Sequence, residues 1–291
     1  MTEPREPASK HFVSQGLKLH YLDWGNAEAP LLIFVHGMHD HARSWDHIAR
    51  HMCKDWHVIA VDLRGHGDSQ WSAEGLYHNP LLLLDFANLI DALGAAQVTI
   101  VAHSLGGNPS ARYTALYPQR VNKLVLVDAM GPSANVIEQW NNEGVVSRSR
   151  AWLEKQKYLA TRPPRRFANL AEATARMAKA NAHLSAEQAE YLTRYGVREY
   201  SDGFGWKYDP ATGNFLPEDF EIDLAEYWRQ ITAPTLLCWG PESWTSNPAT
   251  DGRGAHFQNH RTLSFDKSGH WIHHDQPELF IAALHEFLAE K

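Results

Sequence analysis

The stretch Val98-Thr-Ile-Val-Ala-His-Ser104-Leu-Gly-Gly107 joins a short apolar segment directly to a helical pattern. Its first four residues predict a buried β-strand, and residues 105–117 predict the helix that follows. A serine at such a sharp turn adopts a strained backbone conformation, which small neighbours on both sides make possible. The turn would expose the Ser104 hydroxyl beside the N–H of Leu105, at the positive end of the helix. We therefore predict that Ser104 is a nucleophile; the alternative is an ordinary serine in a strand-to-helix turn.

Alternating strand and helix patterns surround this stretch over the first 130 residues. Apolar runs predict strands, and apolar residues three to four positions apart predict helices. Short strand–helix–strand spacing indicates an α/β fold, a mostly parallel sheet with helices on both faces. The expected strands are residues 12–13 and 17–24, which form a hairpin, 31–35, 57–63, 98–101 and 121–127, and the expected helices are residues 44–52, 81–93 and 105–117.

The pattern changes between residues 131 and 229, where only helical stretches are expected. The expected helices there are residues 136–158, 170–181 and 185–195, and after them come strands at 235–239 and 261–265 and a helix at 277–288. We expect two parts: a core domain of residues 1–130 and 230–291, and a helical cap inserted between them as residues 131–229.

Three of these helices carry capping signals at their starts. Ser185 and Gln188 have the spacing of a capping box. Asn79 precedes a proline and is expected to cap the helix after it. Asp275, with Glu278 three residues later, is expected to cap the last helix.

Composition narrows the class of protein. Of the 291 residues, 44% are apolar and 21% are charged, which excludes a disordered chain, collagen and a coiled coil. The net charge of −7 argues against nucleic acid as a partner. The chain has two cysteines, too few for a disulfide framework, no apolar run near the roughly 18 residues of a membrane span, and no signal-peptide pattern in residues 1–10. We expect a cytoplasmic protein, monomer or homodimer, whose partner is a small molecule.

Two further segments supply groups that a nucleophilic serine needs. The apolar run Leu31–Val35 ends in His36-Gly37-Met38, which makes the N–H of Met38 a second donor to a developing oxyanion. The segment Ser268-Gly269-His270-Trp271 follows the last expected strand, where a rigid loop can present His270 as a general base. His270 also follows Ser104 in the chain, which fits the Ser–acid–His order of one hydrolase fold.

Together these segments resemble the α/β-hydrolase family, in a form with a helical cap. The matching motifs are His36-Gly37, Asp62-Leu-Arg-Gly-His-Gly-Asp-Ser69, Ala102-His-Ser-Leu-Gly106, Leu124-Val-Leu-Val-Asp128 and Gly269-His270. The resemblance covers the chain except for the insertion, and it implies that Ser104 is the nucleophile and His270 the general base. The amides of Met38 and Leu105 would form the oxyanion hole, and the insertion would be the lid that shapes the pocket.

The acid that would complete this set is where the chain departs from the family's usual pattern. Many members place Asp three residues after the glycine that ends the penultimate strand; here that glycine is Gly240, and the position holds Ser243. Glu242 lies one residue early but has a longer side chain. Asp128 follows the expected strand over residues 121–127, where some relatives place the acid. We favour Asp128 and keep Glu242 as the alternative.

The motifs predict a serine hydrolase that cleaves a carboxylic ester of a small, apolar substrate through an acyl-enzyme, without a cofactor. Relatives with similar residues also cut lactones, amides, thioesters and carbon–carbon bonds, and some bind ligands with little turnover. Ser104 stands where epoxide hydrolases and haloalkane dehalogenases need Asp, which argues against both of those chemistries.

Aromatic and histidine side chains close to the motifs are candidates to line the pocket. We expect substrate contacts from His36, Trp71, Trp244 and Trp271, and further candidates in the insertion are Trp140, Trp152 and Trp206. Residues 36–41 are rich in histidine, but Met38 stands where a metallo-hydrolase pattern needs His. We therefore predict no metal site.

Overall fold

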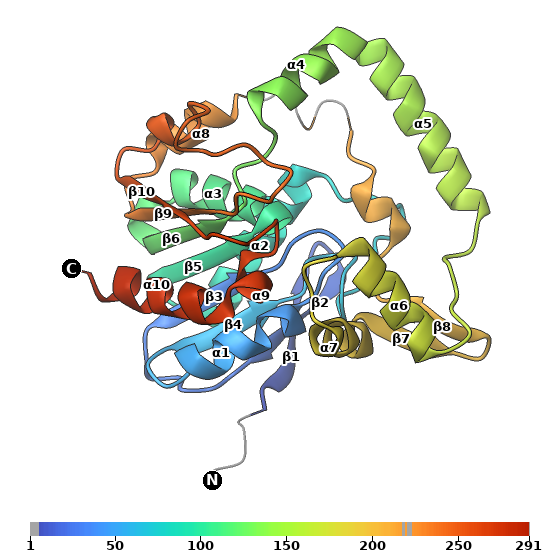
Figure 1. Cartoon of the computed structure of the whole chain (residues 1–291), viewed down its shortest axis with the longest axis horizontal. Helices are drawn as coiled ribbons and strands as arrows, with labels where there is room; N and C mark the ends of the chain where they lie inside the picture. Colours follow the sequence, from blue (N-terminus) through green and yellow to red (C-terminus); the bar gives the residue numbers. More distant parts are fainter. Residues whose placement is uncertain (1–5, 217–218, 220–222, 291) are drawn as a thin grey trace.

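The computed structural model describes residues 6–216, 219 and 223–290 and is built on an eight-stranded sheet (Figure 1). The strand order is β1-β2-β4-β3-β5-β6-β9-β10; the pairs β1–β2 and β2–β4 are antiparallel and the others are parallel. The strands are Ala8–Ser14 (β1), Leu17–Asp23 (β2), Leu31–Val35 (β3), His57–Val61 (β4), Val98–His103 (β5), Val121–Val127 (β6), Thr235–Trp239 (β9) and His260–Ser264 (β10). The predicted mostly parallel α/β sheet is confirmed. The prediction that residues 1–10 carry no signal peptide falls partly on residues 1–5, which lie outside the described residues.

Helices cover both faces of this sheet, and its central strands are buried along their whole length. Every residue of β3 and β5 is buried. Phe86, Tyr113 and Trp228 belong to the apolar cluster on one face, and Ile48, Ile272 and Phe280 belong to the cluster on the other. The helices of the first face are α2 (Asn79–Leu93), α3 (Gly107–Leu116) and α8 (Leu224–Gln230), and those of the second are α1 (Asp46–Met52), α9 (Ile272–Asp275) and α10 (Pro277–Ala289).

The insertion is more varied than the sequence predicted. It contains α4 (Ala134–Glu143), α5 (Val145–Thr161), α6 (Leu170–Ala180), α7 (Ala186–Gly196), β7 (Val197–Tyr200) and β8 (Gly203–Trp206). The expectation of helices alone is wrong, because β7 and β8 form an antiparallel hairpin in which Gly203 has a φ of +125°. The helix expected over residues 136–158 is also two helices, broken at Gly144, whose φ is +73°. Figure 1 shows α4 and α5 arching away from the sheet.

One of the three predicted helix caps is confirmed and two are wrong. Ser185 forms the expected capping box at the start of α7. Asn79 lies inside α2, and its side chain donates to the backbone carbonyl of Asp219 instead. Asp275 does not cap α10, and its carboxylate accepts from the N–H of Gly269. In both cases a tertiary partner competes with the local helix end for a short polar side chain.

The predicted end of the insertion at residue 229 falls within α8, which packs against α3 on the core. The division of the chain into core and cap therefore remains a prediction. Across the part of the chain that the structure describes, no helix is both long enough and apolar enough to cross a membrane. The cytoplasmic location and the oligomeric state also remain predictions.

Candidate active site

The candidate nucleophile lies at a strained turn between β5 and α3. Ser104 has a φ of +49°, a backbone conformation that is uncommon for residues with a side chain. The turn lies close against its neighbours: a Cβ at Gly106 would lie 2.6 Å from the carbonyl oxygen of His36, and a Cβ at Gly107 would lie 2.3 Å from that of Ala129. Only glycine fits at these two positions, and the close packing holds Ser104 in its strained conformation.

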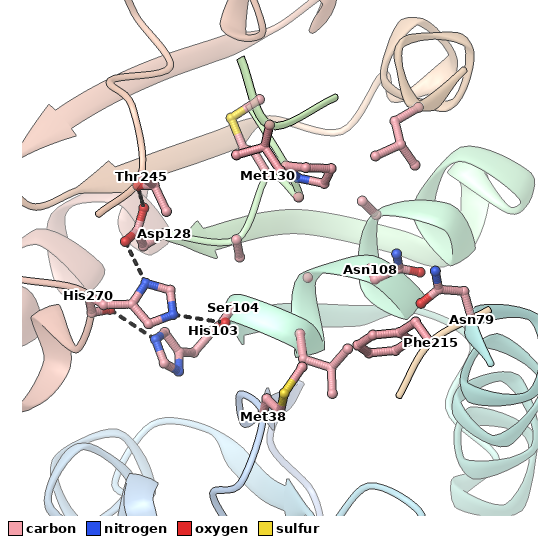
Figure 2. A pocket seen from close by; sticks show the side chains of 18 of the residues that line it. Met38, Asn79, His103, Ser104, Asn108, Asp128, Met130, Phe215, Thr245 and His270 are labelled. Atoms are coloured by element: carbon pink, nitrogen blue, oxygen red, sulfur yellow. Dashed lines mark hydrogen bonds and ion pairs between the residues drawn. The ribbon is translucent and has the colours of Figure 1, made fainter. Parts of the chain in front are cut away.

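His270 joins Ser104 to a carboxylate. Its Nε2 lies 2.9 Å from Oγ of Ser104, and its Nδ1 lies 2.6 Å from Oδ2 of Asp128 (Figure 2). These residues follow β5, β6 and β10, so they meet where three parallel strands end. If Nδ1 carries a proton and donates a hydrogen bond to the carboxylate, Nε2 can accept the serine proton. We call this set the triad.

Asp128 is held by two further donors, both from the loop after β9. The hydroxyl of Ser243 donates to Oδ2 at 2.5 Å, and the hydroxyl of Thr245 donates to Oδ1. Ser243 is the position at which the usual pattern has its acid, and here it supports an acid from the neighbouring strand. Glu242 is half exposed, with its Oε2 3.8 Å from Nε2 of His183, and no contact in the described residues joins it to the triad. The structure therefore brings Asp128, and not Glu242, to the imidazole.

The two predicted oxyanion donors lie beside the serine. Met38 and Leu105 both line the same cavity as Ser104. The loop after β3 approaches the turn closely, because a Cβ at Gly37 would lie 3.0 Å from Cβ of Ser104. Leu105 lies in the first turn of a short 3₁₀ helix, Ser104–Gly106, where backbone N–H groups lack partners within the helix. This placement suits an oxyanion hole, and the role of both amides remains a prediction.

His36 supports the loop instead of facing the cavity. Its Nε2 accepts from the N–H of Leu63 at 3.0 Å, and its Nδ1 donates to the carbonyl of Gly37 at 2.6 Å. Burial lowers the pKa of His36, which keeps the imidazole neutral and able to accept. The expected substrate contact of His36 is wrong, because the backbone occupies both ring nitrogens and the side chain is fully buried.

A cavity of about 500 Å³, lined mainly by apolar side chains, opens at Ser104. Trp244 and Trp271 both line it, and the ring of Trp244 lies 5.0 Å from that of His270. Trp140 reaches the cavity from α4. Contact of these three tryptophans with a substrate remains a prediction.

The other candidate tryptophans lie elsewhere. The indole N–H of Trp71 donates to the carbonyl of Lys207 at 2.9 Å, and Trp71 is absent from the cavity wall, so its expected substrate contact is wrong. The indole N–H of Trp152 donates to the carbonyl of Asn214, and Trp206 packs against Phe167. These side chains fix the insertion and the loop after β4 in place.

Sequence reasoning missed the polar part of the cavity wall. This part consists of Asn79, Asn108, Arg112 and Asp219. Figure 2 shows Asn79 and Asn108 on the side of Ser104 that is away from His270. Asn108 and Arg112 follow Ser104 by four and eight residues, and this helical spacing could have identified them. No local signal connects Asn79 or Asp219 to the site, because both come from distant parts of the chain.

Three buried side chains behind the triad could hold a metal ion. The ligand atoms of Asp40, His103 and His273 all lie within 4.8 Å of one another. Nε2 of His103 also lies 2.9 Å from the carbonyl oxygen of His270, so this cluster supports the loop that carries the candidate base. The histidines among residues 36–41 belong to no group of possible metal ligands in the described ranges, and from that stretch Asp40 alone does.

Comparisons with known proteins agree with this fold. Residues 30–277 match the family model for the alpha/beta hydrolase fold. Epoxide hydrolase 4 of Mus musculus is 25% identical over 286 residues, which cover 95% of this chain and 77% of the relative. Esterase Rv0045c of Mycobacterium tuberculosis is 29% identical over 274 residues, which cover 89% of this chain and 83% of the relative.

Solved structures show the same similarity. The structure of that esterase has a TM-score of 0.77 at 25% identity and covers 98% of this chain and 93% of its own. E-2-(acetamidomethylene)succinate hydrolase has a TM-score of 0.81 at 20% identity, covers 98% of this chain and 100% of its own, and supports the fold alone. Hydrolases and esterases among the relatives support hydrolase activity for this chain.

Proposed function

Because the chain belongs to the α/β-hydrolase fold family, we propose that it is a serine hydrolase that cleaves a carboxylic ester of a small, largely apolar substrate through an acyl-enzyme. The observation that carries the proposal is the hydrogen-bonded chain from Ser104 through His270 to Asp128 at the mouth of a mainly apolar cavity. The proposed reaction needs no cofactor.

The proposed mechanism follows from the order of these contacts. Ser104 attacks the acyl carbon while Nε2 of His270 takes the hydroxyl proton. Asp128 orients the imidazole and stabilises the imidazolium that forms. The amides of Met38 and Leu105 would stabilise the negative oxygen of the tetrahedral intermediate. His270 then gives its proton to the departing alcohol, and a water molecule, activated in the same way, releases the acyl group.

The relatives include both epoxide hydrolases and esterases, and the nucleophile favours the second chemistry. Epoxide opening in this family uses an aspartate at the turn after the fifth strand, where this chain has Ser104. A serine forms an ester with an acyl group and releases it to water, which suits esters and related acyl compounds.

The test is hydrolysis of p-nitrophenyl esters from acetyl to decanoyl, with Ser104→Ala as the matched blank. We expect turnover by the wild type and a loss of about 10⁴-fold or more in the variant. The acyl length with the highest kcat/KM would measure the length of the cavity. A wild type that cleaves no ester but is labelled at Ser104 by a fluorophosphonate would point to a lactone, amide, thioester or carbon–carbon bond. A wild type that is neither active nor labelled would point to a ligand-binding protein.

A further inference from the structure

Arg112, on α3, is a buried cation in the wall of the cavity, and no carboxylate among the described residues forms an ion pair with it. Its exposed fraction is 3%, and it lines the same cavity as Ser104. Its Nε and Nη2 make no hydrogen bond, and no ion pair involves it within the residues that the structure describes. Its nearest aromatic neighbour is Tyr227, whose ring centre lies 5.3 Å from the guanidinium carbon.

The other two buried arginines show how unusual this is. Arg64 makes two hydrogen bonds to the carboxylate of Asp85, at 2.5 and 2.7 Å. Arg253 binds the carboxylate of Asp251 at 2.7 Å and also donates to backbone carbonyls. A guanidinium stays charged at every physiological pH, so it cannot avoid the cost of burial by losing its proton. Among the described residues the ring of Tyr227 is the partner of Arg112, and a negatively charged group that enters the cavity would neutralise its charge.

Asp219, an acidic residue in the same wall, already has hydrogen-bond partners within the protein. Asp219 lines the cavity, and its Oδ2 lies 3.1 Å from Nδ1 of His78 and accepts from the N–H of Leu216 at 3.1 Å. Its Oδ1 accepts from the backbone N–H of Asn79 at 3.3 Å. These contacts anchor Asp219 to its own loop and to the start of α2, and no hydrogen bond or ion pair connects it to Arg112 in the described chain.

The position of Arg112 relative to the triad indicates which part of a substrate would reach it. The departing alcohol must lie near His270, which gives it a proton. Figure 2 places Asn108 on the other side of Ser104, and Arg112 lies one helical turn beyond Asn108 on α3. The acyl group therefore extends along α3. The 3₁₀ turn Ser104–Gly106 and the first residues of α3 span about 13 Å between the Cα atoms of Ser104 and Arg112, so the acyl chain needs several carbon atoms to reach the guanidinium.

We infer that Arg112 binds a carboxylate at the far end of the acyl group, so that the preferred substrate is a monoester of a dicarboxylic acid. A guanidinium presents paired N–H donors that match the two oxygens of a carboxylate. The amide of Asn108, one turn away on the same face of α3, is available as a further donor. The apolar wall between Ser104 and Arg112 contacts the methylene chain. This inference rests on the proposed function, because it assigns one part of the substrate of the same site.

The experiment compares matched substrates. Mono-p-nitrophenyl esters of adipic, pimelic and suberic acid are measured against the same esters in which the free carboxylate is a carboxamide. We expect the wild type to prefer the carboxylate by about 100-fold in kcat/KM at the best chain length, as a charged hydrogen bond in a buried site allows. In Arg112→Met the ratio of the two kcat/KM values should fall to about 1. Arg64→Met removes a buried arginine that is paired with Asp85 and does not line this cavity, so it should keep the ratio.

Stability provides a second readout. Removing an unpaired buried charge should raise the melting temperature of the unliganded protein, by about 2 °C or more, in Arg112→Met. Removing a paired buried charge should lower the melting temperature in Arg64→Met. A fall in melting temperature for Arg112→Met, with an unchanged substrate ratio, would show that Arg112 is structural and would overturn the inference.

Failure of the inference and failure of the proposed function give different results. Equal hydrolysis of the carboxylate and carboxamide esters by the wild type would overturn the inference and leave the serine hydrolase standing. If neither ester is cleaved, adipate, pimelate and suberate are tested as ligands by thermal shift. A rise in melting temperature in the wild type that disappears in Arg112→Met supports the carboxylate site, and no rise in the wild type overturns it.

Discussion

Asp128 and Arg112 are two charged residues on the wall of one cavity, and their surroundings are opposite. Asp128 has donors from Ser243, Thr245 and His270. Arg112 has no hydrogen-bond partner for its Nε and Nη2 in the described chain. A buried charge that the protein satisfies itself is oriented before any substrate arrives. A buried charge that the protein leaves unsatisfied gains its partner from the ligand. The comparison therefore separates the part of the cavity that we assign to the reaction from the part that we assign to substrate choice.

The largest expected effect is at the satisfied charge. Asp128→Asn should lower kcat on the best ester by about 10⁴-fold, because the amide cannot stabilise the imidazolium and favours the wrong tautomer of His270. Glu242→Gln is the matched control, since it neutralises a nearby carboxylate that no contact joins to the triad, and it should keep kcat within about threefold. Steady-state rates of both variants decide between the two acids, and the reverse pattern would make Glu242 the acid.

Buried histidines are a third case that sharpens the comparison, because an imidazole, unlike a guanidinium, can lose its charge. Burial lowers the pKa of His36 and holds the pKa of His66 well below its ordinary value. The unfolded chain then binds more protons than the folded one below about pH 6.5, so stability is complete above that pH and falls on acidification. Each of the two should contribute a loss of about 1.4 kcal/mol per pH unit, until the pH reaches its folded pKa.

Urea unfolding at pH 7.5, 6.5 and 5.5 measures this dependence. The free energy of unfolding should be level between the first two and drop steeply at the third. His66→Gln should reduce the steepness, because one titrating group is removed and its contact with the carbonyl of Arg64 can be kept. A free energy that is unchanged at pH 5.5 would contradict the assignment of neutral buried imidazoles.

The smallest expected effect is on the donors that hold Asp128. Ser243→Ala and Thr245→Val each remove one hydroxyl from the carboxylate and should lower kcat by about tenfold, with KM nearly unchanged. Thr250→Val is a matched control from the same loop, whose hydroxyl bonds only the carbonyl of Asn247 in the described chain. If the two variants behave like the control, then His270 alone orients Asp128.

Much of the fold could be predicted from sequence, because strands and helix caps are specified by residues that lie close together in the chain. The apolar strands β3 and β9 have the predicted bounds, and the box at Ser185 needs only residues within one turn of helix. The predicted caps at Asn79 and Asp275 are wrong because distant backbone groups bind those side chains. The hairpin β7–β8 was missed because its four-residue strands carry little apolar signal.

The sequence by itself determined the strand, turn and helix around Ser104 and the loop that carries His270, since both depend on neighbouring residues and on glycines that permit close approach. Only the tertiary structure decided which carboxylate meets His270, because Asp128 lies 142 residues away from it and hydroxyls from a third segment hold it there. The tertiary structure alone also decided that His36 is turned inward and that Arg112 is buried with no ion pair to another described residue. Local geometry follows from the residues that share a turn, whereas the partners of a buried polar group depend on which distant segments the sheet brings together.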